Sequence, residues 1–193
     1  MTANSDLVAL DIETSGLEPE HDRVLAIGLA SPDGAMTRIS DDELELLHWA
    51  EDQLSAMPSR RILVTWNGEE FDLPFLRRRF DEYGITTTLV LAPRGQIGKY
   101  GKQLYSAHWG PHHHVDISDD YRQFALSRHI AWSLKPVARD ILGIDPVVVD
   151  NSGASIASMD RTVLKNYLRS DIEITLALAA RLPKARYSEP LPS

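Results

Sequence analysis

The chain has 193 residues, of which 43% are hydrophobic and 25% are charged, and its formal net charge is -8. This length and composition are those of a globular protein with one complete hydrophobic core. The acidic balance argues against tight non-specific binding to nucleic acid, which requires Lys and Arg to neutralise phosphates. It does not exclude an enzyme that acts on nucleic acid, because bound divalent cations reverse the local charge.

Other classes of protein are excluded by what the chain lacks. It has no cysteine, so it can form neither disulfides nor thiolate metal sites. The first residues show no basic segment followed by an apolar stretch, so we predict no secretory signal. No apolar run is long enough to cross a bilayer. We therefore expect a cytoplasmic protein with no membrane partner.

Hydrophobic patterns predict strands and helices along the chain. Apolar and β-branched runs predict strands at residues 7–13, 24–30, 36–39, 62–66 and 114–117. Apolar residues at helical spacing predict helices between Ser40 and Pro58, between Asp72 and Gly84, and at residues 121–131, 134–142 and 160–182. This order of elements predicts an α/β domain with a mixed sheet.

The remaining segments are less regular. Residues 86–91 fit a strand or an extended loop, residues 94–110 fit a long loop or an irregular hairpin, and residues 145–155 fit a loop. Ser40 and Glu43 predict a capping box at the start of the first helix. We find no internal repeat and no linker, and predict a single domain over residues 1–185 and a flexible tail at 186–193.

Two carboxylates close the first predicted strand, after the apolar run Leu7–Leu10. Side chains alternate along a strand, so Asp11 and Glu13 point the same way. Two like charges on one face repel each other unless a cation lies between them. The pattern therefore predicts a divalent-metal site at the carboxyl end of a central strand. The Asp-x-Glu spacing also occurs at Asp41 and Asp171, so other residues must decide.

Two further carboxylates are candidates for this site. Asp72 follows the fourth predicted strand, and if that strand neighbours the first, both carboxyl ends open into one crevice. The alternative is that Asp72 only caps its own helix. Asp171 shares a face of the last helix with Tyr167 and Thr175, close to an apolar stripe. The alternative is a half-exposed Asp171 paired with Arg or Lys.

Three motifs occur in order along the chain: Asp11-x-Glu13, Asn67-x-x-x-Phe71-Asp72 and Tyr167-x-x-x-Asp171. Together they resemble the motifs of the DEDD-type 3′–5′ exonuclease family, tyrosine subclass. The resemblance covers about residues 7–180 and is strongest to the proofreading domain of family B DNA polymerases and its stand-alone relatives. It implies a ribonuclease H-like fold, with a five-stranded mixed sheet and helices on both sides.

The resemblance also implies a set of catalytic residues: Asp11, Glu13, Asp72, Tyr167 and Asp171. The four carboxylates would bind two Mg²⁺ or Mn²⁺ ions, which favour oxygen ligands. Tyr167 would orient the attacking water, because a phenol with a pKa of about 10 is a poor base at neutral pH. Substrate-binding roles would fall to Thr14, Leu17, Asn67 and Phe71.

The activity implied is metal-dependent release of nucleoside 5′-monophosphates from the 3′ end of single-stranded nucleic acid, with DNA favoured over RNA. One alternative is a catalytically silent module of the same fold that binds nucleic acid or protein. Another is an endonuclease or RNA-cleaving enzyme on the same scaffold. The sequence identifies no protein partner.

Three further patterns have simpler interpretations. Neighbouring residues of a strand point to opposite faces, so the three histidines 112–114 cannot all bind one ion, and we expect them in a loop or at a strand edge. Asp116 fits a helix cap. Basic and aromatic residues alternate from Lys99 to Tyr105, as in proteins that bind single strands. An ordinary irregular hairpin explains that last pattern equally.

Overall fold

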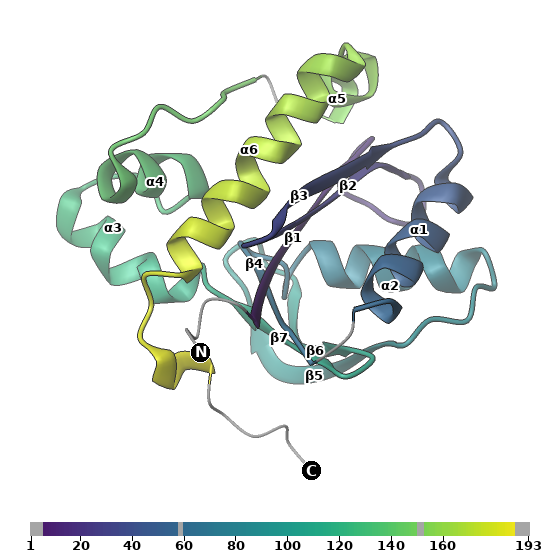
Figure 1. Cartoon of the computed structure of the whole chain (residues 1–193), viewed down its shortest axis with the longest axis horizontal. Coiled ribbons are helices and arrows are strands. Elements are labelled where there is room, and N and C mark those ends of the chain that lie inside the picture. The colour runs from purple at the N-terminus through teal and green to yellow at the C-terminus, as the bar shows by residue number, and fades with distance from the viewer. Residues whose placement is uncertain (1–5, 58–59, 150–152, 188–193) are drawn as a thin grey trace.

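The centre of the fold is strand β1, which has an antiparallel neighbour on one side and a parallel neighbour on the other. The structure is a computed structural model that describes residues 6–57, 60–149 and 153–187. Within these residues, seven strands pair in the order β3-β2-β1-β4-β7-β6-β5 (Figure 1). The strands are β1 (Leu7–Thr14), β2 (Val24–Ser31), β3 (Gly34–Ile39), β4 (Ile62–Thr65), β5 (Leu89–Ile97), β6 (Gln103–Trp109) and β7 (His112–Asp116).

The sheet is mixed, as predicted. β1 pairs antiparallel with β2 and parallel with β4, and β4 pairs parallel with β7. β6 and β5 extend the sheet by antiparallel pairing. Because β1 and β4 are parallel neighbours, their carboxyl ends lie at the same edge of the sheet. This is the arrangement that Asp11 and Asp72 require if they are to meet.

Helices cover both faces of the sheet (Figure 1). On one face, α1 (Glu43–Ser55) and α2 (Asp72–Glu82) pack on a core that includes Leu10 and Phe80. On the other face, α6 (Arg161–Ala179) crosses β1 to β4. It shares a second core with α3 (Arg122–Arg128), α4 (Leu134–Leu142) and α5 (Gly153–Ser158). No helix within the described residues is both long enough and apolar enough to cross a bilayer.

The alternation of β1 between these two cores decides where its carboxylates point. Residues 8, 10 and 12 pack into the core beneath α1 and α2, whereas residues 7 and 9 pack into the core beneath α6. Asp11 and Glu13 continue the odd-numbered series. They therefore emerge on the side of the sheet that α6 covers.

The sheet has seven strands rather than the five that the resemblance implied. Residues 94–110, for which a long loop and an irregular hairpin were both open, form a hairpin of β5 and β6. Its register shifts between Pro93 and Ile97, so the alternation of side chains is broken and the strand pattern is hidden in the sequence. The predicted loop at 145–155 is also partly wrong, because α5 begins at Gly153.

The predicted capping box at Ser40 and Glu43 is wrong. Asp42 is the N-cap of α1, and its side chain accepts a hydrogen bond from the Leu44 backbone N–H at 3.0 Å. Ser40 instead donates to Glu45 at 2.6 Å. An aspartate next to the predicted cap residue fulfils the same role, and this leaves Glu43 free for a tertiary contact.

Glu43 forms a buried ion pair with Arg79 of α2. Nε and Nη2 of Arg79 donate to the two carboxylate oxygens at 2.9 and 2.7 Å. The backbone N–H of Val24 in β2 donates to the same carboxylate at 2.8 Å. The side chains of Glu43 and Arg79 are 2% and 11% exposed. This bidentate contact fixes α1, α2 and β2 relative to one another.

The predicted C-terminal tail begins with two residues that contact the domain. Arg186 donates to the Asp120 carboxylate at 2.9 Å, and the Tyr187 hydroxyl donates to the Ala179 carbonyl at 2.7 Å. The rest of that tail, residues 188–193, lies outside the described residues, as does Pro58, the predicted end of the first helix.

We expect the substitution Arg79→Met to lower the free energy of unfolding by about 3 kcal/mol, because it leaves a buried carboxylate without its cation. Urea unfolding followed by circular dichroism measures this loss. Arg78→Met is the matched control, since that side chain lies on the exposed side of the same helix, and we expect a change within about 0.5 kcal/mol. Equal losses in the two variants would contradict the structural role of the buried pair.

Candidate metal centre

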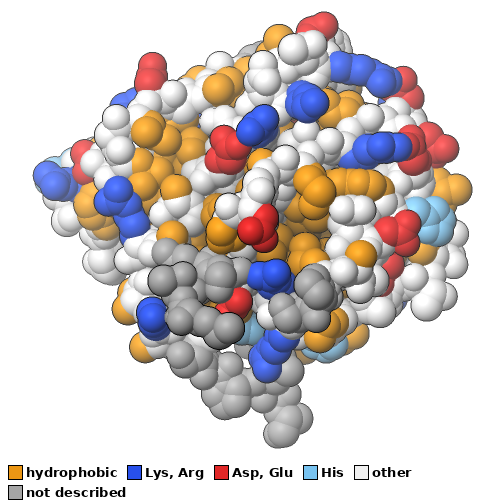
Figure 2. Space-filling view, in the orientation of Figure 1, with side chains coloured by type: hydrophobic (Ala, Val, Ile, Leu, Met, Phe, Trp, Pro, Cys, Tyr) orange, Lys and Arg blue, Asp and Glu red, His pale blue; other side chains and the backbone are white. Residues whose placement is uncertain are grey.

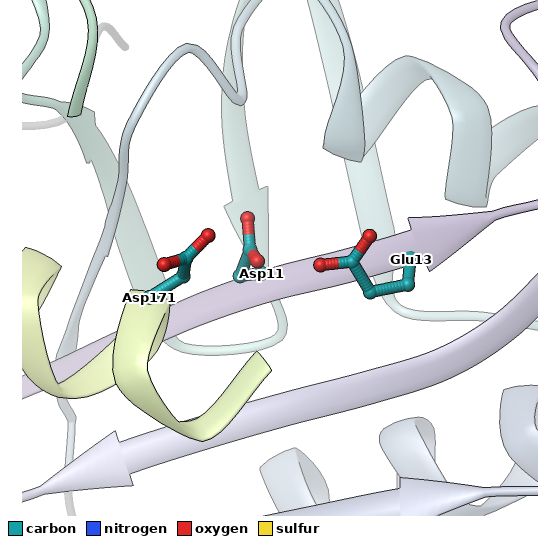
Figure 3. Close-up of side chains that lie close together, drawn as sticks. All are labelled: Asp11, Glu13 and Asp171. Atoms are coloured by element: carbon teal, nitrogen blue, oxygen red, sulfur yellow. The ribbon is translucent and has the colours of Figure 1, made fainter. Parts of the chain in front are cut away.

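Three carboxylates from distant parts of the chain meet between β1 and α6. Each of Asp11, Glu13 and Asp171 has an oxygen within 4.8 Å of an oxygen of the other two. Figure 3 shows the three side chains close together, those of Asp11 and Glu13 on β1 and that of Asp171 on the helix beside it. Asp171 is 6% exposed, so it is not the half-exposed surface aspartate that the sequence left open as an alternative.

A glycine lets α6 approach β1 closely enough for this contact. Gly28 of β2 lies directly opposite Asp11 in the antiparallel register. A Cβ atom at Gly28 would lie 3.0 Å from side-chain carbons of Leu168 and Ile172 on α6. Those two residues flank the position of Asp171 on the helix. A larger residue at position 28 would push the helix, and with it Asp171, away from β1.

Asp72 joins this group from the start of α2. One of its carboxylate oxygens accepts a hydrogen bond from the backbone N–H of Ile12, which lies between the two β1 carboxylates, at 3.2 Å. The negative charge of Asp72 also helps to raise the pKa of Asp11, so the two carboxyl groups are close neighbours. No side-chain capping bond is formed at the start of α2. Asp72 is therefore directed to β1 and does not serve as the cap of its own helix.

The electrostatics of the site show the cost of this assembly. Burial, followed by the negative charges of its three neighbours, raises the pKa of Asp11 well above its usual value. Burial is also the main reason why the pKa of Glu13 rises to about 8 and that of Asp72 to about 7. The pKa of Asp171 rises to about 6 for the same reason. The site therefore favours either protons or a cation.

Lys135 of α4 supplies one cation, and the sequence analysis missed it. Its Nζ lies 3.2 Å from a carboxylate oxygen of Asp171 and 3.5 Å from the centre of the Tyr167 ring. Its charge lowers the pKa of Asp11, Glu13 and Asp171, although burial outweighs it in all three. The sequence offered only helical spacing, which puts Lys135 on the same face of the predicted helix 134–142 as the apolar Ala138.

The residues of the site fit a divalent metal ion. One carboxylate oxygen of Asp171 is buried and has no hydrogen-bond partner, which is unfavourable unless an ion binds it. Carboxylate oxygens are the ligands that Mg²⁺ and Mn²⁺ prefer. Asp11, Glu13 and Asp171 would hold such an ion, and Asp72 lies beside Asp11.

Residues 8–173 match the model of a family described as the RNase_H superfamily. The chain belongs to the RNase H superfamily. The ribonuclease H-like fold predicted from the sequence is thereby confirmed. The candidate metal site at the end of the central strand therefore belongs to a chain whose superfamily includes nucleic-acid-processing domains.

Several DNA polymerases contain a region similar to this RNase H superfamily chain. It is 28% identical over 118 residues to the catalytic component of DNA polymerase epsilon from Dictyostelium discoideum, a match covering 61% of this chain and 5% of the relative. It is also 28% identical over 152 residues to DNA polymerase 1 of Sulfolobus acidocaldarius, covering 76% of this chain and 16% of the relative. The chain therefore spans only a small part of these relatives.

The same similarity appears among solved structures. The family B DNA polymerase of the archaeon Pyrobaculum calidifontis superposes with a TM-score of 0.68 and 20% sequence identity. The match covers 91% of this chain and 24% of the polymerase. At this identity the comparison establishes the fold of the RNase H superfamily domain and not its activity.

The remaining predicted site residues lie in segments next to the carboxylates. Tyr167 is buried one turn before Asp171 and forms a hydrogen bond with it. Thr14 ends β1, and its hydroxyl donates to the Gly16 carbonyl at 2.6 Å. Leu17, in the turn that follows, is 67% exposed. Phe71 precedes Asp72 and packs on Phe75, with ring centres 5.5 Å apart.

Asp116 of β7 has a role that the sequence analysis did not identify. Its carboxylate accepts hydrogen bonds from the backbone N–H groups of Asn67 at 3.1 Å and Glu69 at 3.0 Å, besides that of Ser118 at 2.9 Å. It therefore holds the loop between β4 and α2 rather than only capping its own turn. Asn67 is held there with a positive φ of 70°.

The three adjacent histidines lie in β7, an internal strand of the sheet, and not in a loop or at an edge. Nδ1 of His112 accepts from the Arg61 backbone N–H at 2.9 Å, whereas Nε2 of His114 bonds Thr65 Oγ1 at 2.8 Å. Burial lowers the pKa of His114 to about 3, so it is neutral. These histidines contribute to the packing of the sheet.

We expect the stability of the metal-free protein to fall as pH rises from about 4, near the ordinary carboxyl pKa, to about 8. The folded state holds protons on carboxyl groups whose pKa is about 6, 7 and 8 in Asp171, Asp72 and Glu13. The unfolded chain has already lost them, so the free energy of unfolding decreases with pH. Thermal unfolding in excess chelator measures this trend.

Thermal unfolding in Mg²⁺ should give the opposite result at high pH. The ion binds the ionised carboxylates of the folded state and should restore stability there. Asp11→Asn is the informative variant. It should be less sensitive to pH in chelator than the wild type and should not respond to Mg²⁺. Stability that rises with pH in chelator would contradict the repulsion among these groups.

We further expect Lys135→Met to lower the free energy of unfolding in chelator by about 2 kcal/mol at a pH of about 8, where the carboxylates it compensates are ionised. The loss should shrink at a pH of about 5, where those groups are protonated. Chemical denaturation at both pH values tests this. Arg139→Met, on the exposed side of the same helix, is the control. A loss that is independent of pH would mean that Lys135 acts only through packing.

Proposed function

We propose that this RNase H superfamily domain is a metal-dependent 3′–5′ exonuclease of the DEDD type, tyrosine subclass. It would release nucleoside 5′-monophosphates from the 3′ end of single-stranded nucleic acid, with DNA favoured over RNA. The proposal rests on the convergence of Asp11, Glu13 and Asp171. Asp72 joins them by accepting a hydrogen bond from the backbone N–H of Ile12, which lies between Asp11 and Glu13. The similarity to regions of DNA polymerases supports DNA as the substrate.

The four carboxylates would hold two Mg²⁺ or Mn²⁺ ions. When bound, such ions lower the pKa of a water and offset the charge of the scissile phosphate. Tyr167, which interacts with Asp171, would orient the attacking water. Lys135 contacts both residues and would also contact a phosphate oxygen.

The substrate would reach the carboxylates between two loops. Leu17 is an exposed apolar side chain four residues after Glu13, and it would contact the terminal base. Thr14, next to Glu13, would line the same pocket. Asn67 and Phe71, in the segment that leads into Asp72, would line the other side of that pocket. Asp116 would act as a positioning residue, because it fixes this loop through backbone hydrogen bonds.

The test is cleavage of a linear single-stranded DNA labelled at its 5′ end. Asp11→Asn and Asp171→Asn should each lower the rate by more than about 100-fold, since they remove proposed metal ligands. Asp41→Asn is the matched control, because Asp41 starts another Asp-x-Glu triplet but is exposed and paired with Arg161. It should cleave like the wild type. Chelator should abolish all activity.

Two outcomes would contradict the proposal. Undiminished cleavage in excess chelator would exclude a metal mechanism. Binding of the strand without any cleavage in Mg²⁺ or Mn²⁺ would favour a catalytically silent module of the same fold. A circular single strand separates end-directed from internal hydrolysis, and a matched RNA strand measures the preference for DNA.

A further inference from the structure

A polar cavity of about 190 Å³ lies beside the loop that carries Asn67. Asn67 forms one wall, and Lys99 and Trp132 form others. Lys99 belongs to the turn between β5 and β6, and Trp132 belongs to the connection between α3 and α4. Three segments that are distant in the sequence therefore meet around this cavity, and only the first has a role in the proposed function.

Two aromatic rings and two cations lie together here: Trp132 and Lys99 line the cavity, and Tyr100 and Arg122 are their neighbours outside its wall. The indole N–H of Trp132 donates to the Ser118 carbonyl at 2.7 Å, which fixes the ring. Nζ of Lys99 lies 4.8 Å from the centre of the Trp132 ring and 4.7 Å from that of Tyr100. The guanidinium of Arg122 lies 4.9 Å from the Trp132 ring. Tyr100 is 64% exposed, an unusual exposure for a large aromatic side chain.

The two cations are available to an anion. Among the described residues, neither Lys99 nor Arg122 has a carboxylate within ion-pair distance. Lys99 donates one hydrogen bond, to the Trp132 carbonyl at 2.8 Å, which leaves two further N–H groups. On the face shown in Figure 2, acidic and basic side chains are interspersed. A nucleic acid would therefore be bound by small groups of cations such as Lys99 and Arg122.

Most acidic groups in the wall of the cavity are already bound. Glu69 forms an ion pair with Arg94. Glu70 accepts hydrogen bonds from the backbone N–H groups of Tyr100 at 2.7 Å and Lys102 at 3.1 Å. Asp116 holds backbone N–H groups of the β4–α2 loop. The fourth, Asp119, is exposed.

Two walls of the cavity, formed by Trp132 and by Glu70, are close in sequence to residues of the candidate metal centre. Trp132 lies three residues before Lys135, whose Nζ contacts Asp171. Glu70, which binds the turn of the hairpin, lies two residues before Asp72. Nζ of Lys102 in that turn donates to the Leu17 carbonyl at 3.0 Å. The aromatic rings therefore stand at a fixed position relative to the carboxylates.

We propose that this cavity binds an unpaired nucleotide of the substrate strand, upstream of the nucleotide that is removed. Tyr100 provides an exposed face on which a base stacks. Trp132 holds Lys99 and Arg122 against its ring, and these two cations contact phosphates. Stacking on aromatic rings combined with local cations is the way proteins hold single strands without regard to sequence. The inference rests on the proposed function and adds to it a subsite, formed by residues of the β5–β6 turn and the α3–α4 segment, for a nucleotide upstream of the cleaved bond.

The experiment compares binding of two oligothymidylates to the full chain in chelator, a dinucleotide and a strand of about eight nucleotides, within the range that single-strand sites cover. Tryptophan fluorescence and the anisotropy of a labelled strand report binding. The wild type should bind the longer strand more tightly. Trp132→Leu and Lys99→Met should each weaken its binding by about tenfold, and most of the advantage of length should disappear.

Lys165→Met is the matched control, because Lys165 is exposed on the side of α6 opposite to Tyr167. It should bind both strands like the wild type. Lys99→Met keeps the test decisive if the loss of the indole in Trp132→Leu disturbs the α3–α4 connection, and circular dichroism shows whether it does. An advantage of length that survives in Lys99→Met and in folded Trp132→Leu would overturn the proposal. Oligouridylate of the same length shows whether RNA uses the same site.

Cleavage in Mg²⁺ separates this proposal from the function on which it rests. If the wild type cleaves the longer strand and Trp132→Leu does so with an unchanged KM, the cavity is not a subsite although the exonuclease assignment stands. If the wild type cleaves nothing, but length-dependent binding is lost in both variants, the cavity binds single strands and the exonuclease assignment fails.

Discussion

The mutual repulsion of four closely spaced carboxyl groups is the constraint on which the rest of this structure depends. Glu13, Asp72 and Asp171 are buried and Asp11 is half-buried beside them, and removal from water raises the pKa of each. A cluster of like charges that is removed from water lowers the stability of the fold. The rest of the domain must therefore hold the carboxylates together, and binding of a metal ion would give a physical reason for this arrangement.

The domain meets this constraint with two separate cores on the two faces of the sheet. The core beneath α6 brings Asp171 down onto β1, and Gly28 allows the close approach. The core beneath α1 and α2 is fixed by the buried pair of Glu43 and Arg79, which sets the position of the helix that begins with Asp72. Each core thus contributes one carboxylate to those of the strand between them.

The net charge of -8 does not conflict with the proposed binding of nucleic acid, because the basic residues are concentrated where the strand would lie. Lys135 faces the carboxylates, and Lys99 and Arg122 lie on aromatic rings near the loop that precedes Asp72. These cations come from the β5–β6 turn and from the segments around α3 and α4, which lie between the second and third sequence motifs. The segments that carry no motif therefore supply the positive charge that the carboxylates lack.

The sequence alone determined the elements whose signal is local. The apolar run before Asp11, the helical spacing around Asp171 and the order of the three motifs were sufficient to predict the strand, the last helix and the ribonuclease H-like fold. Alternation along β1 placed Asp11 and Glu13 on one face, because the period of a strand is a property of the backbone itself. The hairpin β5–β6 was left open, since its register shift breaks that alternation.

Only the tertiary structure decided which residues meet. Glu43 had the spacing of a capping box, yet it pairs with Arg79, and Asp72 had the position of a cap, yet it bonds the backbone of Ile12. Lys135 and Trp132 carried no motif and were found only when α4 was placed beside α6. The spacing of residues in the sequence predicts only the contacts that a side chain can make with its own segment. Partners that are 36 or 60 residues away come into contact only when the chain has folded.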